Sequence, residues 1–195
     1  MRAFLAVPSD PMWVESARRL VDQLREKMPR ASWTRPEAWH LTLHFLGEVE
    51  DEKVARFAAE VEPLAMETVP GDLIARPATV FPDRGRPRVL GVGFDVSAGV
   101  AAVSNLAALA AEIASKLGLR AEERAFHPHV TFARLREPWP RPAVDEYARE
   151  LEAWPFPTWN ARSCVLFESR LEPAGAVHTP LHEWTFQGGP RGVRA

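Results

Sequence analysis

The sequence predicts an α+β fold in which antiparallel sheets and helices surround a cleft. Strand-like and helix-like segments alternate along the 195 residues. No glycine-rich loop of the GxGxxG or GxxxxGK[ST] type follows a strand, which argues against a Rossmann or P-loop nucleotide enzyme. Two strand-like segments, 40–43 and 129–132, share one pattern and lie nearly half the chain apart. The alternation of elements and the missing glycine-rich loops favour an α+β arrangement with antiparallel sheets.

From the N-terminus the sequence predicts a strand, a helix, a strand and a helix, over residues 2–7, 11–28, 39–46 and 51–64. The first helix has the clearest start, because Asp10 is a capping residue and Pro11 suits the first turn. Apolar residues then recur at helical spacing until Pro29 ends the pattern. The second strand ends at Gly47.

The rest of the chain predicts two strands, a long helix, a strand, a shorter helix and two final strands, over residues 72–80, 88–96, 97–117, 128–135, 143–153, 161–168 and 181–187. The long helix is rich in alanine and ends at Gly118. Prolines mark the turns between the later elements. Because the chain shows no clean domain boundary, we expect a single domain over residues 1–195, long enough for two small lobes that share one core.

The composition is that of a globular protein, with 46% hydrophobic and 26% charged residues. A net charge of −2 gives no overall basic field of the kind that announces a nucleic-acid partner. The single cysteine, Cys164, excludes an internal disulfide and fits a reducing compartment. The apolar run at the N-terminus is too short for a signal peptide or a membrane span. We therefore expect a cytoplasmic monomer with no membrane or protein partner.

The two related segments each contain a His-x-Thr pair: His40 with Thr42, and His129 with Thr131. Residues two apart on a strand point to the same face, so each pair shares a face while the intervening apolar residues point to the core. If the strands are neighbours, two imidazoles and two hydroxyls converge on one cleft. One His-x-Thr pair is a weak signal, but two copies half a chain apart are far more specific.

Such a cleft is suited to a particular chemistry. Two histidines with pKa values near neutrality can supply a proton donor and a proton acceptor together. Threonine hydroxyls can donate hydrogen bonds to the non-bridging oxygens of a phosphate held between them. The pattern predicts a site that opens a strained cyclic phosphodiester without a metal or another cofactor.

The sequence resembles the 2H phosphoesterases, and within them the RNA 2′,3′-cyclic phosphodiesterases, also called 2′-5′ RNA ligases or LigT-like proteins. The resemblance covers nearly the whole chain. It lies in the opening segment, in both motifs without gaps, and in further short segments, namely 1–7, 40–47, 80–82, 87–90, 126–134 and 165–169.

The resemblance implies a bilobal 2H phosphoesterase-like fold, with two pseudo-symmetric antiparallel-sheet lobes and outer helices around a central cleft. It implies hydrolysis of a 2′,3′-cyclic phosphate at an RNA end, tRNA fragments among the candidates, to a 2′-phosphate. It also implies ligation of RNA ends through a 2′-5′ linkage. In this scheme His40 is the general acid at the leaving 3′ oxygen, His129 is the general base on water, and no metal takes part.

The sequence departs from the family's pattern at two places. The family often has a Trp after the Pro-Arg-Val-Leu segment, where this chain has Gly91. The family commonly has Gly-x-x-Tyr near the C-terminus, where this chain has His178 in place of the Tyr. Either change is expected to alter base stacking or the shape of the cleft.

Strand parity also predicts the orientation of neighbouring residues. It places His44 on the face of His40, where it would reach the substrate or line the rim of the cleft. The same parity places Phe45 in the core. Arg134 fits the family's pattern for phosphate binding, but parity points it away from His129 unless a bulge turns it inward. A structural ion pair is the competing role for Arg134. The loop from Arg84 to Arg88 is either an RNA contact or a solvated turn.

Three other hypotheses remain open from the residues alone. A related 2H phosphodiesterase would act on 2′-5′ oligoadenylate or on a small cyclic nucleotide. A binding module for RNA ends would have lost turnover, which the intact motifs argue against. A metal site would use four histidines, His40, His44, His127 and His129, although no carboxylate stands at a ligand spacing beside them.

Overall fold

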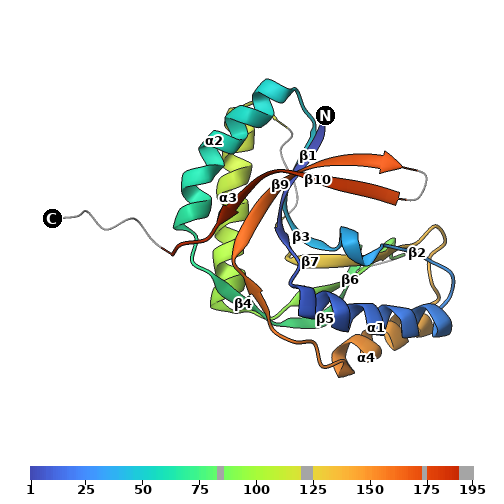
Figure 1. Cartoon of the computed structure of the whole chain (residues 1–195). Helices are drawn as coiled ribbons and strands as arrows, with labels where there is room; N and C mark the ends of the chain where they lie inside the picture. Colours follow the sequence, from blue (N-terminus) through green and yellow to red (C-terminus); the bar gives the residue numbers. More distant parts are fainter. Residues whose placement is uncertain (83–85, 120–124, 173–174, 189–195) are drawn as a thin grey trace.

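The computed structural model describes residues 1–82, 86–119, 125–172 and 175–188. Figure 1 shows its helices and strands. They follow the order β1 (Arg2–Pro8), α1 (Pro11–Lys27), β2 (Ser32–Trp33), the 3₁₀ turn η1 (Pro36–Ala38), β3 (His40–Glu48), α2 (Asp51–Glu67), β4 (Gly71–Leu73), β5 (Ala75–Phe81), β6 (Val89–Phe94), α3 (Ala98–Lys116), β7 (His129–Arg134), α4 (Arg141–Ala153), β8 (Trp159–Ala161), β9 (Ser163–Glu172) and β10 (Gly175–Thr185).

The described strands form two four-stranded sheets and one two-stranded sheet. The first sheet has the order β10-β9-β1-β3, the second β2-β7-β6-β5, and the small one pairs β4 with β8. All of these pairs are antiparallel. The predicted α+β class with antiparallel sheets is confirmed.

Two halves of the chain, each contributing two paired strands to one large sheet, share the same order of strands and helices. One half runs β1-α1-β3-α2 and the other runs β6-α3-β7-α4. In each half the first and second strands pair with each other, β1 with β3 and β6 with β7. The second strand of each half carries a His-x-Thr motif. The predicted pseudo-symmetry of the halves therefore extends to the order of helices and strands.

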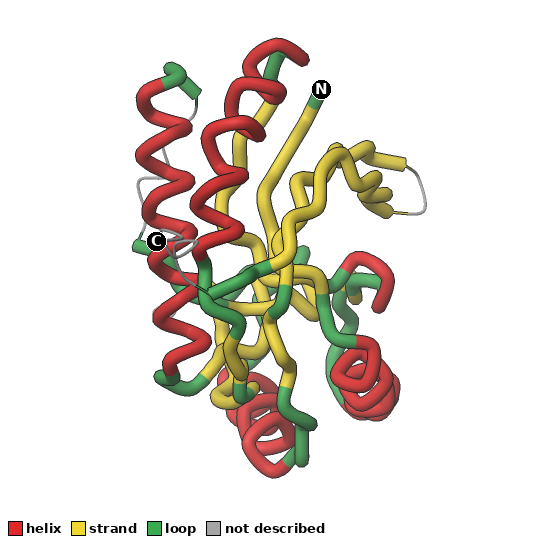
Figure 2. The backbone as a smooth tube through the Cα atoms, turned by 60° about the vertical axis from the view of Figure 1, so that its left-hand side comes forward, coloured by secondary structure: helices red, strands yellow, loops and turns green. Residues whose placement is uncertain are grey.

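The helices cross over between the halves. Helix α3 connects two strands of the second sheet but packs against β3 of the first sheet and against α2. Helix α1 connects two strands of the first sheet but places Trp13 against Phe132 of β7, and Trp154 after α4 donates a hydrogen bond to Ser16. Figures 1 and 2 accordingly show α2 beside α3 and α1 beside α4. Each large sheet is covered by two helices, one from the N-terminal half and one from the C-terminal half.

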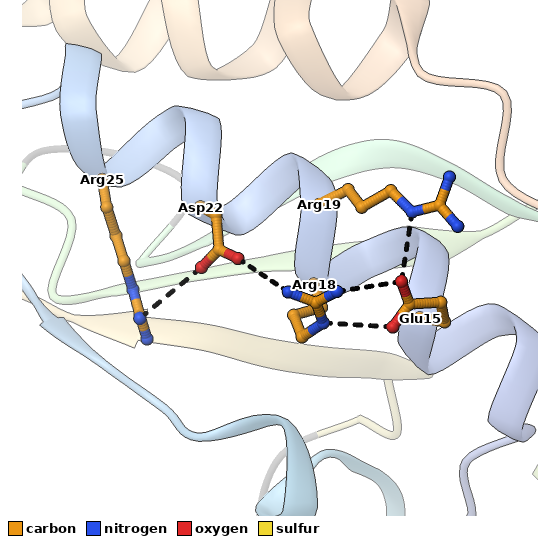
Figure 3. A network of polar contacts seen from close by, with 5 residues as sticks. All are labelled: Glu15, Arg18, Arg19, Asp22 and Arg25. Atoms are coloured by element: carbon orange, nitrogen blue, oxygen red, sulfur yellow. Dashed lines mark hydrogen bonds and ion pairs between the residues drawn. The ribbon is translucent and has the colours of Figure 1, made fainter.

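Helix α1 illustrates why the sequence forms these elements. The Asp10 carboxylate accepts hydrogen bonds from the backbone N–H groups of Met12 and Trp13, at 2.8 and 3.1 Å, which confirms the predicted cap. One face buries apolar residues, and the opposite face carries a chain of ion pairs from Glu15 to Arg25 (Figure 3). These exposed pairs contribute little stability, so the buried face holds the helix in place.

The predicted strand 72–80 is in fact two strands in different sheets. Residues 71–73 pair with β8, residues 75–81 pair with β6, and Ile74 between them is 44% exposed. The chain passes from one sheet to the other next to the place where β4 lies against the start of α3. A Cβ atom on Gly71 would come within 2.5 Å of the Cα of Gly99, so only glycine permits the approach. Periodicity alone cannot show such a change of partner.

Helix α3 is long and apolar enough, by length and composition, to cross a membrane. Here it packs between other elements and buries Val103, Leu106, Ala110 and Ile113. Its apolar character is accounted for by these contacts with both halves of the protein.

Replacement of Trp13 tests whether the crossed helices join the halves into one cooperative unit. The ring is fully buried and lies against four aromatic rings at centroid distances of 5.3 to 6.4 Å, those of Trp39, Phe132, Phe156 and Trp159. Trp13→Ala should lower the free energy of unfolding by about 3–5 kcal/mol. Urea unfolding followed by circular dichroism and by tryptophan fluorescence should show one coincident transition. Met12→Ala, at an adjacent exposed position, should change stability by less than about 0.5 kcal/mol. Two separate transitions would contradict the single domain.

Candidate active site

One cleft of about 550 Å³ receives side chains from both motifs. His40 and Thr42 line it from β3, and His129 and Thr131 line it from β7. The strands β3 and β7 belong to different sheets and contact each other. The structure thus brings together the four residues that the repeated motif singles out.

The alternate residues of both motif strands hold the strands in place. Leu41 and Leu43 of β3, and Val130 and Phe132 of β7, are at most 5% exposed and join one hydrophobic core. The ring of Trp39 lies 5.0 Å from that of Phe132 between centroids. Burial of these side chains fixes which face of each strand points to the cleft.

The two histidines are oriented in the same way. Nδ1 of His40 lies 2.8 Å from the backbone carbonyl of Ala38, and Nδ1 of His129 lies 2.7 Å from that of His127. A carbonyl only accepts hydrogen bonds, so each Nδ1 carries a proton and donates it. Nε2 is left as the nitrogen that can exchange a proton with a substrate.

An aromatic ring supports each imidazole. Phe4 stacks on His40 with centroids 4.7 Å apart, and Phe81 lies against His129 at the same distance. Each phenylalanine comes from a strand of the same sheet as its histidine, β1 and β5. The rings limit how the imidazoles can turn and shield them from water.

A bulge interrupts both motif strands directly after the threonine. In the β1–β3 pairing Thr42 faces Ala6 and His44 faces Leu5, so Leu43 is an extra residue. In the β6–β7 pairing Phe132 is the extra residue in the same way, between Thr131 and Ala133. A bulge reverses the alternation of side chains beyond it. The residues three positions after the two threonines, Phe45 and Arg134, consequently line the cleft.

The bulge in β3 overturns two expectations based on strand parity. His44 is 3% exposed, does not line the cleft, and stacks on Phe57 of α2 at 6.5 Å. Its predicted place on the face of His40 is therefore wrong. Phe45, expected in the core, is 38% exposed and belongs to the wall of the cleft. Because His44 lies outside the cleft, the four histidines of the metal hypothesis do not form one site. No group of three or more potential ligands occurs within the described ranges.

The bulge in β7 decides the orientation of Arg134. The side chain lines the cleft beside His129 and Thr131, as family-like phosphate binding requires. The competing structural ion pair is absent, since no carboxylate pairs with Arg134 in the part of the chain that the structure describes. Its charge helps to lower the pKa of His129. In the loop from Arg84 to Arg88, Arg84 lies outside the described residues, and the Arg88 guanidinium donates a hydrogen bond to the carbonyl of Arg136.

Burial governs the protonation of both histidines. Desolvation, followed by the nearby His178, lowers the pKa of His40 from 6.5 to about 4. Desolvation also lowers the pKa of His129. In the free protein both rings are neutral at pH 7, so each Nε2 is a proton acceptor until a negative substrate arrives.

Sequence reasoning left several cleft residues unassigned. His178 of β10 meets the ring of His40 edge-on with centroids 5.2 Å apart, so the departure from the family's Gly-x-x-Tyr pattern falls inside the site. Arg2, Arg35 and Ser169 also line the cleft. Arg2 and Ser169 reach the histidines through the pairing of β1 with β9, and Arg35 does so from the segment that precedes η1.

The other departure, Gly91, has a steric cause. A Cβ atom at this position would lie 2.3 Å from the carbonyl oxygen of Val130, next to the bulge of β7. The Gly91 carbonyl also accepts a hydrogen bond of 2.9 Å from the hydroxyl of the buried Tyr147. This backbone leaves no room for a side chain, so a Trp cannot occupy the same place.

Two His-x-Thr strands that face one cleft from two related antiparallel sheets define a 2H phosphoesterase. The chain matches the model of the family described as LigT like Phosphoesterase over residues 8–91 and 99–178. The protein belongs to the LigT-like phosphoesterase family.

Relatives and solved structures agree with this assignment. An RNA 2′,3′-cyclic phosphodiesterase of Thermus thermophilus is 30% identical over 96% of this chain and 91% of its own length. One of Aquifex aeolicus is 28% identical over 96% and 98%. The crystal structure of the Thermus thermophilus protein TT0787 has a TM-score of 0.75 and 26% identity, and covers 96% of this chain and 99% of that one.

The low pKa of His40 predicts a specific dependence of stability on pH. Between about pH 6.5 and pH 4 the unfolded chain binds a proton on this imidazole and the folded protein does not. The free energy of unfolding therefore falls as the pH decreases through this window. His40→Gln removes that contribution, so its stability should decline less steeply over the same window. Urea unfolding of both proteins at several pH values measures the difference. Parallel curves would mean that His40 titrates normally in the folded state.

Proposed function

We propose that this protein hydrolyses 2′,3′-cyclic phosphate ends of RNA to 2′-phosphates. The observation that carries the proposal is the pair of histidines in one cleft with two threonines. Each Nδ1 donates a hydrogen bond to the backbone carbonyl two residues earlier, and among the described residues no hydrogen bond engages either Nε2. Relatives that span nearly the whole chain are named RNA 2′,3′-cyclic phosphodiesterase, which supports the substrate class.

The reaction needs one proton acceptor and one proton donor on opposite sides of the phosphorus. Nε2 of His129 accepts a proton from water as the water oxygen bonds to phosphorus. The bond from phosphorus to the 3′ oxygen breaks, and Nε2–H of His40 protonates that oxygen. The phosphate stays on the 2′ oxygen. Afterwards His129 releases its proton and His40 regains one from solvent, so the enzyme is restored.

The surroundings of the two rings favour these roles. Burial, and to a smaller extent the Arg134 charge, lowers the pKa of His129, so this ring is neutral and able to accept a proton. Burial opposes protonation of His40 in the free protein, so its acid role depends on the substrate. The negative phosphodiester between the rings raises the pKa of His40 on binding. Thr42 and Thr131 donate hydrogen bonds to the non-bridging oxygens, where charge builds up.

A 5′-hydroxyl of a second RNA in place of water would give a 2′-5′ linkage by the same steps. We propose this ligation as a secondary activity. A net charge of −2 and a compact length of 195 residues fit a monomer, and we propose that state. A single cysteine suits a reducing compartment, and we propose the cytoplasm.

Analysis of the product of a short RNA with a 2′,3′-cyclic phosphate, in the presence of EDTA, tests the proposal. Each of His40→Ala and His129→Ala should lower turnover by roughly 10²- to 10⁴-fold, because each removes one proton transfer. Thr42→Val and Thr131→Val should cost less and leave the fold intact.

His182→Ala is the matched control, since His182 lies on β10 outside the cleft and stacks on Trp184. A 3′-phosphate product would keep the histidine chemistry but reverse the leaving oxygen. Turnover only of 2′-5′ oligoadenylate or a small cyclic nucleotide would assign another substrate, and tight RNA binding without turnover of any phosphodiester would identify a binding module.

The pH profile gives a second test of the mechanism. One ring must be protonated and the other neutral, so kcat/KM should follow a bell-shaped curve. Because burial lowers the pKa values of both free histidines, the maximum should lie below about pH 6.5. The maximum of kcat should lie at higher pH, since the bound phosphodiester favours the imidazolium. A flat profile between about pH 5 and 8 would contradict the two-histidine mechanism.

A further inference from the structure

The cleft extends beyond the two motifs onto the first sheet. On β1 the odd residues Ala3, Leu5 and Val7 belong to the core, whereas Arg2 lines the cleft and Phe4 packs under His40. Two residues along a strand span about 6.6 Å. Arg2 therefore projects from the same face of β1 as Phe4, whose ring supports His40, and is the next residue along that face.

Arg2 belongs to a row of polar residues across three strands. The β1–β9 register places Ala3 opposite Glu168, so continuing it by one residue brings Arg2 beside Ser169. The β9–β10 register places Ser169 opposite His178. All three residues line the cleft. We call the row Arg2, Ser169 and His178 the basic ledge.

The basic ledge is connected to the reacting centre at one end and faces a second arginine. His178 meets His40 edge-on, and burial, followed by the charge of Arg2, lowers the pKa of His178. Arg35, which precedes η1, lines the same cleft. Its guanidinium lies 3.7 Å from where a Cβ of Gly175 would stand, beside the hairpin that carries His178.

The polar groups here lack protein partners. Neither Arg2 nor Arg35 forms an ion pair, and the Ser169 hydroxyl makes no hydrogen bond, within the described residues. By contrast Arg170, next to Ser169, is paired with Glu168. Unpaired guanidinium groups in a cleft suit an anion with several oxygens, such as a phosphodiester.

From this placement we infer that the basic ledge and Arg35 bind the phosphodiester that precedes the terminal nucleotide of the RNA. The inference rests on the proposed function and adds a substrate class to it. The enzyme is an oligoribonucleotide phosphodiesterase, and a mononucleoside 2′,3′-cyclic phosphate, which lacks the internal phosphate, is a poor substrate. Arg2 and Arg35 are specificity residues and take no part in proton transfer.

Two substrates with the same terminal nucleotide test the inference: a mononucleoside 2′,3′-cyclic phosphate and a dinucleotide with one internal phosphodiester. The wild type should prefer the dinucleotide by about tenfold or more in kcat/KM. Arg2→Gln and Arg35→Gln should each lose about tenfold more on the dinucleotide, through KM, than on the mononucleotide. Arg2→Lys should restore part of the loss, since the charge returns without the fork.

Arg170→Gln is the matched control. Arg170 carries the same charge and is adjacent to Ser169 in the chain, but it lies outside the lining of the cleft. Its kinetics should equal those of the wild type. The dependence of log KM on log salt for the dinucleotide should become shallower by about 0.7 in each specificity variant. Equal preference of the wild type for both substrates, or equal losses on both in the variants, would overturn the inference.

A binding measurement separates this inference from the proposed function. Calorimetry compares the dissociation constants of the 2′-phosphate forms of the two nucleotides, which requires no turnover. Tighter binding of the dinucleotide that is lost in Arg2→Gln supports the basic ledge even if neither cyclic phosphate is opened. Normal turnover with no difference in binding between the two ligands would retain the proposed function and refute the basic ledge.

Discussion

The cleft depends on one packing constraint, the burial of alternate side chains from β3 and β7 in a common core. Leu41 and Leu43 from one strand and Val130 and Phe132 from the other belong to the same hydrophobic core. Once they are buried, the residues between them must face outward together. The proposed catalytic arrangement therefore results from the same contacts that stabilise the fold, and it is organised before any substrate binds.

Much of this arrangement was predictable from the sequence because strands alternate with a period of two. His40, Thr42, His129 and Thr131 follow that period and were placed correctly. The prediction failed at His44 and Phe45, because the extra residue in β3 reverses the alternation and nothing in the local sequence marks it. The departure at His178 was visible in the sequence, but its contact with His40 was not, and Arg2 was not singled out at all. Arg2 and His178 reach the site through pairing between strands that are far apart in the chain.

In the proposed mechanism the arginines of the cleft bind the substrate and the histidines transfer protons. Fixed positive charge is supplied by arginines, which remain protonated under all ordinary conditions. The reacting histidines lie in a drier setting that keeps them neutral until an anion arrives. In the proposed mechanism the bound phosphodiester therefore brings about the protonation of His40 that makes this residue an acid. This division explains why guanidinium groups line the cleft whereas the two imidazoles lie against phenylalanine rings.

The crossed helices have a consequence for how the chain can be divided. A cut after α2 would leave an N-terminal fragment whose α1 has its apolar face matched to a sheet in the other fragment. The C-terminal fragment would carry α3, whose partners are β3 and α2 of the first. Neither piece holds a complete core, so the halves, alike as they are in element order, are not interchangeable modules. Each fragment would need the other to complete its hydrophobic core.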